Sequence, residues 1–322
     1  MEILVCPACR GKLELTDAVM KEDEIYTGNL VCNCGEKYPI IEFVPRFVPY
    51  TNYSDSFGLQ WNKFRETQLD KYNGTNISED RFYNETYWKE ERSMEGQWIF
   101  EGGCGSGRFL EIAARTKAEV IGVDLSSAVD AARESLKDLP NVHLIQADLF
   151  KLPFKEGSFD GVYSIGVIQH TPDPKALFAH FPKYLKQGGK LCLTFYPRKR
   201  FTLLYSKYII RPITKRIPAK IFIKLLRITM PVLFPLTYIL FHIPVLNWLF
   251  IRMIPVTNYV FEKRLSMKQR YEWALLDTFD MLTPCYDQPQ RHAEARVILK
   301  KNRIKVDEAL SAYEGNIKGI KD

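Results

Sequence analysis

The residues most able to do chemistry form a glycine-rich loop that opens with an acid. The loop spans 101–107, reads EGGCGSG, and lies between a short apolar run and a helical pattern. Glycine permits positive φ angles and lets a ligand approach the backbone closely. Because Glu101 would repel a pyrophosphate but attract an ammonium group, we expect this loop to bind a positively charged ligand. The loop alone is weak evidence, since dinucleotide-binding enzymes have a similar one.

Two further acids follow the next two predicted strands. Asp124 comes after the strand predicted at 119–123, the position at which nucleotide-binding sheets hold a ribose diol. The alternative is that Asp124 only precedes a helix near Ser126, because Asp and Ser both favour helix N-termini. Asp148 follows Ala147 at the end of the third strand. Its carboxylate can accept a hydrogen bond from an exocyclic amine such as that of adenine.

In this order, the motifs resemble those of the class I S-adenosylmethionine-dependent methyltransferase family. The resemblance covers residues 96–197 and includes the strand sequence FDGVYS, the sequence IQHTPDP and the sequence LKQGGKL. It implies that the 101–107 loop surrounds the methionine part of the cofactor, and that the region 164–170 faces the transferred methyl group. The implied cofactor-binding residues are Glu101, Gly103, Gly105, Gly107, Asp124, Leu125, Ala147, Asp148 and Ser164.

His170 is the candidate catalytic residue, because the resemblance places it at the active edge of the sheet. A neutral imidazole can remove a proton from a hydroxyl or amine acceptor. The alternative is a structural histidine whose ring bonds a loop backbone. Related enzymes that methylate planar amino groups carry an Asn/Asp-Pro-Pro-aromatic sequence at the fourth strand. This chain lacks that sequence, which weighs against methylation of the exocyclic amines of bases.

Four of the seven cysteines lie within the first 34 residues, which favours a metal site over a disulfide framework. Two cysteine pairs can form a tetrahedral thiolate site that gives a small module its fold. The sequences CPAC, LVCNCG and YPI resemble the zinc ribbon of Trm112-like proteins. That resemblance implies a structural Zn2+, with a metal-free ribbon as the alternative, and we expect Cys104, Cys192 and Cys285 to be buried. The predicted zinc ligands are Cys6, Cys9, Cys32 and Cys34.

The remaining pattern predicts an α/β fold. Short apolar strands alternate with helices over 96–197, which indicates a parallel sheet covered on both faces. We expect a helix over 174–186 that ends at Gly188-Gly189, and two helices with one last strand after residue 266. The predicted class is a Rossmann-like seven-stranded methyltransferase sheet with an N-terminal zinc ribbon and a helical apolar and basic insertion. The predicted segments are 1–50 (zinc ribbon), 51–95 (helical cap), 96–197 (cofactor-binding core), 198–265 (insertion) and 266–322 (completion of the core).

Positive charge is concentrated in one segment, although the net charge is +7. No acid occurs between Asp173 and Glu262, and 15 Lys and Arg lie there. The stretch 228–251 has no Asp, Glu, Lys or Arg, and it is long enough to span a bilayer. Since the last elements should return to the same sheet, we expect an interfacial helical subdomain that contacts an anionic membrane. The alternative is a buried lid that touches no lipid.

These observations predict an S-adenosylmethionine-dependent enzyme that methylates a small hydrophobic or lipid-linked acceptor. An RNA methyltransferase is the first alternative, but nucleic acid has no use for the long apolar stretch. A non-catalytic cofactor-binding scaffold or activator is the second. The N-terminus shows no basic and apolar leader pattern. We therefore expect a cytoplasmic protein, peripheral at the inner face of the membrane.

Overall fold

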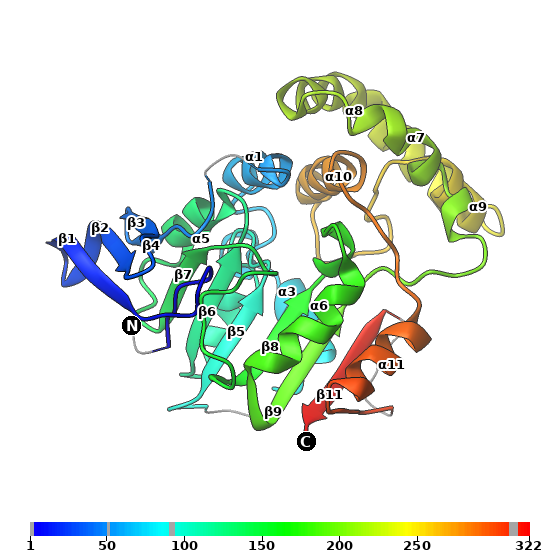
Figure 1. Ribbon diagram of the computed structural model, residues 1–322. Coiled ribbons are helices and arrows are strands. Elements are labelled where there is room, and N and C mark those ends of the chain that lie inside the picture. Colours follow the sequence, from blue (N-terminus) through cyan, green and yellow to red (C-terminus); the bar gives the residue numbers. More distant parts are fainter. Residues whose placement is uncertain (1–2, 50–51, 90–93, 309–314) are drawn as a thin grey trace.

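The computed structural model describes residues 3–49, 52–89, 94–308 and 315–322, and within them two sheets (Figure 1). The N-terminal sheet has four antiparallel strands in the order β1-β2-β3-β4, joined by short turns. Buried residues alternate with half-buried ones in the second half of β2, which ends at Cys32, and with exposed ones along β3. These strands are β1 (Leu13–Lys21), β2 (Glu24–Cys32), β3 (Lys37–Ile41) and β4 (Val44–Pro45).

The central sheet has seven strands in the order β10-β11-β9-β8-β5-β6-β7. Strands β5 to β9 are mutually parallel, and β11 runs antiparallel to both β9 and β10. This topology confirms the predicted fold class. The strands are β5 (Trp98–Gly102), β6 (Glu119–Asp124), β7 (Val142–Gln146), β8 (Phe159–Ile165), β9 (Leu185–Thr194), β10 (Ile304–Val306) and β11 (Asn316–Lys321).

Helices cover both faces of this sheet, because its parallel strands are apolar on both sides. The α3, α4 and α5 side buries one cluster, and the α6 and α11 side buries another. These helices are α3 (Ile77–Glu85), α4 (Leu110–Ala114), α5 (Ala128–Leu136), α6 (Pro174–His180) and α11 (His292–Lys301).

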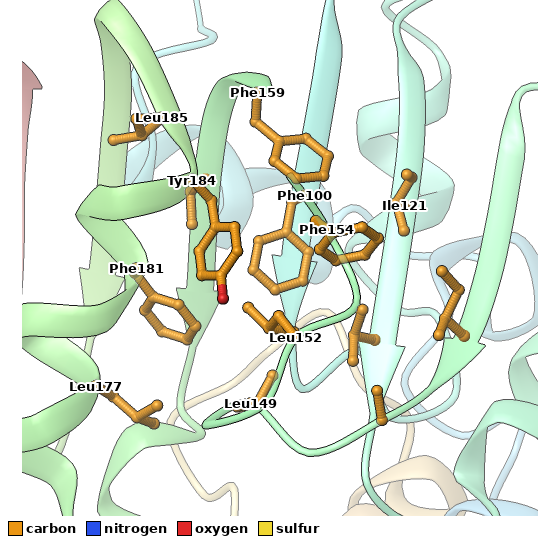
Figure 2. Packing of buried hydrophobic residues seen from close by; sticks show 14 of the residues in the cluster. Phe100, Ile121, Leu149, Leu152, Phe154, Phe159, Leu177, Phe181, Tyr184 and Leu185 are labelled. Atoms are coloured by element: carbon orange, nitrogen blue, oxygen red, sulfur yellow. The ribbon is translucent and has the colours of Figure 1, made fainter. Parts of the chain in front are cut away.

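Aromatic rings fill the centre of the second cluster (Figure 2). Phe100 of β5 contacts the rings of Phe154, Phe159 and Phe181, with centroids 5.5 to 5.9 Å apart. Such offset and edge-to-face contacts add to the stabilisation that area burial provides. This packing holds β5, whose last residues begin the glycine-rich loop, against its neighbour β8.

Two predictions about secondary structure are wrong. The helix expected at 174–186 ends earlier, at Tyr184 of the 3-10 helix η2 (Phe181–Tyr184), and Gly188-Gly189 lies inside β9. The tail contains two strands, β10 and β11, where one was expected. Strand β10 has only three residues, so its alternation is too short to stand out from the preceding helix.

The four-stranded sheet packs on the free side of β7. Phe47 N–H donates to the Gln146 carbonyl at 2.8 Å, and the Arg46 guanidinium bonds both Gln146 Oε1 and the Asp130 carboxylate. Nearby, Arg10 donates to the carbonyls of Leu152 and Phe154. The N-terminal module is therefore joined by backbone and side-chain bonds to the region that follows β7.

The segment after β9 forms an outer helical layer. Figure 1 shows α7 (Ser206–Thr214), α8 (Ala219–His242) and α9 (Asn247–Met253) at the rim of the molecule, with α10 (Met267–Leu282) between α8 and the sheet. Within the described residues, α8 is long and apolar enough to span a membrane, and 28% of its apolar 18-residue stretch is buried. The predicted helical insertion is thus present, packed on α10 through a third apolar cluster.

Candidate functional site

A cavity of about 510 Å³ opens at the carboxyl ends of β5, β6 and β8. Ligands of open α/β sheets bind at this edge. Helix α1 (Asp55–Lys63), α10 and residues of the outer layer complete its wall. Predicted site residues that line the cavity are Glu101, Gly103, Gly105, Asp124, Leu125 and His170.

The glycine-rich loop lets a side chain from α1 approach its backbone. Gly105 has a φ of +54°, and a Cβ there would lie 3.0 Å from Trp61 Nε1. Gly107 lies outside the cavity lining, under the side chain of Leu136, and its contact with the cofactor stays a prediction. A Cβ on Gly107 would meet Leu136 Cδ1 at 2.4 Å, so this glycine allows the loop to pack on α5.

Glu101 is a buried acid at the base of the cavity. The Tyr163 hydroxyl donates to its Oε2 at 3.0 Å. Burial raises the pKa of Glu101 well above its usual value, although the hydrogen bond from Tyr163 opposes this shift. A cationic group beside the carboxylate would favour its charged form and offset the burial cost. The observed surroundings therefore suit the ammonium ligand expected from the sequence.

Asp124 connects the loops that follow β5 and β6. Its Oδ2 accepts from Gly105 N–H at 3.0 Å, and its Oδ1 accepts from the Ser126 N–H and hydroxyl at 2.8 and 2.7 Å. Burial raises the pKa of this carboxyl, and these hydrogen bonds oppose the shift. Asp124 bonds Ser126 just before α5 and also lines the cavity, so its contact with a ribose stays a prediction. The carboxylate accepts three hydrogen bonds from the protein and has further acceptor capacity for a ligand.

Three other predicted cofactor residues lie outside the cavity lining. Ala147 is fully buried, and Asp148 Oδ1 accepts from Phe150 N–H at 3.0 Å, in the loop next to the lining residue Leu149. Ser164 is buried, and its hydroxyl donates to the Gly102 carbonyl at 2.7 Å. Ser164 therefore bonds the start of the glycine-rich loop, so its hydroxyl proton is not available to a ligand.

His170 lies in the 3-10 helix η1 (Ile168–His170), at the end of β8. Its Nδ1 is 3.0 Å from the Tyr286 carbonyl oxygen. A carbonyl only accepts, so Nδ1 carries the proton and the neutral ring has its lone pair on Nε2. This Nε2 is buried and has no hydrogen-bond partner among the described residues. The ring is thus fixed by a backbone bond, as the structural alternative held, and the residue also lines the cavity.

Two acids of α10, Asp277 and Asp280, also line the cavity. Asp277 accepts hydrogen bonds from Gln68 and from the Tyr259 hydroxyl, and Asp280 accepts one from Gln60. Burial, together with the charge of Asp280, raises the pKa of Asp277 to about 7. The Gln68 amide also accepts from Arg108 at 2.8 Å, so it connects this carboxylate to a buried guanidinium.

Sequence analysis missed most of the aromatic wall, because its members come from segments far apart in the chain. No local spacing connects residues of α1 with Tyr196, which follows β9, or with residues of α10. The missed aromatic and cationic lining residues include Tyr53, Phe57, Trp61, Arg81, Arg108, Tyr196, Lys207, Tyr259 and Trp273.

The predicted metal ligands converge. The sulfur atoms of Cys6, Cys9, Cys32 and Cys34 all lie within 4.8 Å of one another, with the closest cross-pairs at 3.4 and 3.7 Å. A tetrahedral zinc site with bonds of about 2.3 Å separates its sulfurs by roughly 3.8 Å. The cluster therefore has the donor set and approximate spacing of a four-thiolate site. Cys285 is exposed, so its predicted burial is wrong, whereas Cys104 and Cys192 are buried.

Comparisons with known protein families match two separate parts of the chain. Residues 100–193 match the methyltransferase domain family, and residues 1–42 match the Trm112p-like protein family. The core thus belongs to the class of S-adenosylmethionine-dependent methyltransferases. The chain joins that core to an N-terminal Trm112-like ribbon.

Similarity to individual proteins is confined to part of the chain. The chain is 37% identical over 106 residues to phosphoethanolamine N-methyltransferase 3 of Arabidopsis thaliana, and the match covers 32% of this chain and 22% of the relative. The chain is 32% identical over 101 residues to a sterol 24-C-methyltransferase of Gibberella zeae, and that match covers 29% of this chain and 26% of the relative. The chain spans between about a fifth and a third of the length of the first curated relatives that it matches.

Some solved structures cover more of the chain, and one of them serves as an example. It is a complex of the Haloferax volcanii Trm112 methyltransferase activator with a methyltransferase, at 15% identity and a TM-score of 0.46, covering 83% of this chain and 97% of that one.

The raised pKa of Asp277 has a consequence for stability. The folded chain holds the proton up to about pH 7, whereas the unfolded chain releases it near 3.8, so stability falls as pH rises between these values. We expect Asp277→Asn to remove this cost and to raise the free energy of unfolding at pH 8 by roughly 2–4 kcal/mol. The gain should shrink below pH 4. Urea unfolding at several pH values measures it, with the exposed Asp138→Asn as control. An Asp277→Asn protein less stable than the wild type at pH 8 would contradict the assignment.

Proposed function

We propose that the chain transfers a methyl group from S-adenosylmethionine to a small hydrophobic or lipid-linked acceptor. The observation that carries this proposal is one continuous cavity. The same cavity is lined by Glu101, Gly105 and Asp124, and also by His170 and the acids of α10. A cofactor and an acceptor held in one enclosed space can be aligned for direct transfer.

The loop residues fit S-adenosylmethionine. Glu101 supplies a buried carboxylate for the amino group, and Asp124 supplies acceptor oxygens for the ribose hydroxyls. The glycines of the loop leave its backbone accessible. When bound, the cofactor supplies a methyl group that its sulfonium has already activated. The protein must therefore hold the acceptor in line and remove its proton.

His170 is the residue that this proposal assigns to proton removal. Its Nδ1–H bond to the Tyr286 carbonyl fixes the tautomer and the ring orientation. The rings of Phe57 and Tyr196 pack edge-on against the imidazole at 5.3 and 5.6 Å, which limits its rotation. The ring is therefore held in one orientation, with Nε2 as the nitrogen that this proposal assigns to accept the proton of a hydroxyl or an amine.

The lining that we assign to the acceptor is aromatic, with polar groups at fixed points. Tyr196 and Trp273 present apolar surface, and Asp277 and Asp280 present carboxylates. Sites of this composition bury most of an apolar ligand and orient it by a few polar contacts. The similarity of the core to a sterol methyltransferase agrees with a hydrophobic acceptor.

Zinc is the metal that we propose for the ribbon. A tetrahedral site of four thiolates leaves no open coordination position on the metal, which suits a structural Zn2+. We expect purified protein to contain one Zn2+ per chain, and Cys9→Ser to lower this content together with the thermal stability of the ribbon. Metal analysis and differential scanning calorimetry measure both, with the exposed Cys285→Ser as control. Equal zinc contents in the two variants would refute the ligand set.

Cofactor binding depends on Asp124 in this proposal. We expect S-adenosylmethionine to bind the wild type, and Asp124→Ala to weaken binding by about 10- to 100-fold, since a hydrogen bond to a charged group contributes about 1.5–3 kcal/mol. Isothermal titration calorimetry measures this, with Asp138→Ala as the exposed acidic control and thermal unfolding as the check on folding. Absence of binding in the wild type would favour a non-catalytic scaffold.

Catalysis depends on His170. We expect His170→Asn, which keeps a donor for the Tyr286 carbonyl, to lower the rate of methyl transfer by about 100-fold or more while leaving cofactor affinity unchanged. Tritium transfer from labelled S-adenosylmethionine into the organic phase of a lipid extract measures the rate. Full activity of this variant would remove His170 from proton transfer. Label confined to RNA in the same mixture would contradict the lipid acceptor.

A further inference from the structure

Exposed apolar side chains are concentrated on the outer helical layer. Of the 25 large apolar residues that are exposed in the described parts of the chain, 17 lie between Phe201 and Phe261. Scattered exposed apolar residues are ordinary, whereas a contiguous group marks an interaction surface. In Figure 1 these helices form the rim of the molecule, on the far side of α10 from the sheet.

Helix α8 has two apolar faces, and its neighbours cover only one. The covered face contains Phe222, Leu226, Met230 and Phe234, which recur every four residues and pack on α10. The opposite face carries a second stripe at helical spacing. These exposed residues are Ile221, Leu225, Ile228, Val232, Leu236 and Ile239. A surface helix normally has polar residues on its outer face, so this stripe needs an occupant.

The neighbouring helices continue the same surface. Ile209 and Ile213 of α7 and Trp248 and Ile251 of α9 are exposed. The Arg252 guanidinium lies over both the Trp248 and Tyr205 rings, at 5.4 and 5.5 Å from their centroids. Such an amphipathic group of tryptophan, tyrosine and arginine suits the boundary between water and lipid.

The charge next to this surface identifies the kind of partner. The chain has no acid between Asp173 and Glu262. Exposed basic residues precede and enter α8, where Lys215, Arg216, Lys220, Lys224 and Arg227 lie. Negative phospholipid headgroups complement these side chains, while the acyl region complements the apolar stripe. A protein partner would have to offer both an apolar face and an acidic border.

The fold excludes the insertion of α8 across a bilayer. The chain enters α8 from β9 and leaves it toward α10 and β11, and β11 pairs with β9 in the same sheet. Both ends of α8 thus connect to one body on one side. The helix can only lie along a surface, with its covered face on α10.

We propose that the outer face of α7, α8 and α9 docks this protein on an anionic lipid surface without crossing it. This surface is defined by the exposed apolar residues from Phe201 to Phe261 and the basic residues beside them. Docking does not depend on the identity of the acceptor. It does bring the cavity close to lipid, because Lys207, Thr257 and Tyr259 of the same segment line the cavity.

The test is flotation of the full-length protein with vesicles. One set contains phosphatidylcholine alone, and the other contains phosphatidylcholine mixed with phosphatidylglycerol. The docking variant is Ile228→Glu with Val232→Glu, at residues that are 73% and 69% exposed. The matched control is Met20→Glu with Val297→Glu, at residues that are 56% and 53% exposed, on the ribbon and on α11.

We expect the wild type and the control to float with the anionic vesicles, and the docking variant to lose at least tenfold in the bound fraction. High salt should release the wild type. Calorimetry with S-adenosylmethionine on the same variants separates docking from cofactor binding. A protein that floats with the vesicles but binds no cofactor would support the docking proposal and contradict the proposed function. Wild-type protein that stays in the soluble fraction, or equal binding by both variants, would overturn the proposal. So would a dimer that the docking variant dissociates, because a second copy would then cover the surface.

Discussion

The site depends on one carboxylate that fixes two loops at once. Strands β5 and β6 are parallel neighbours, so the loops that follow them emerge at the same edge of the sheet. Asp124 accepts hydrogen bonds from Gly105 in the first loop and from Ser126 in the second. The loops therefore keep a fixed separation before any ligand arrives. An ordered site of this kind avoids the entropy cost of arranging its backbone during binding.

The buried acids of this cavity lower the stability of the folded chain when they are charged. Burial raises the pKa values of Glu101, Asp124 and Asp277, which means that each carboxylate is less stable in its charged form than it would be in water. Hydrogen bonds from Tyr163, Gly105 and Gln68 recover only part of that loss. Groups with perturbed pKa values that converge in one cavity are typical of functional sites.

Local chemistry made part of this site predictable from the sequence. Glu101, Gly105 and Asp124 follow predicted strands directly, and the topology of a parallel sheet then places them together. Sequence order shows which loop a residue belongs to but not which way it faces, so it did not predict that the Ser164 hydroxyl bonds Gly102 or that Gly107 packs under Leu136. The wall formed by α1 and α10 was not predictable, since Trp61 and Asp277 meet only through tertiary packing.

The position of the ribbon has a consequence for the free chain. Without the module, β7 would be an edge strand of the central sheet, with unpaired backbone groups that can template pairing with another molecule. Phe47 and Arg46 occupy part of that edge, and a metal held by the four cysteines would contribute to the fold of the ribbon that carries them. Loss of such a metal would therefore expose more of the β7 edge to pairing with a second molecule.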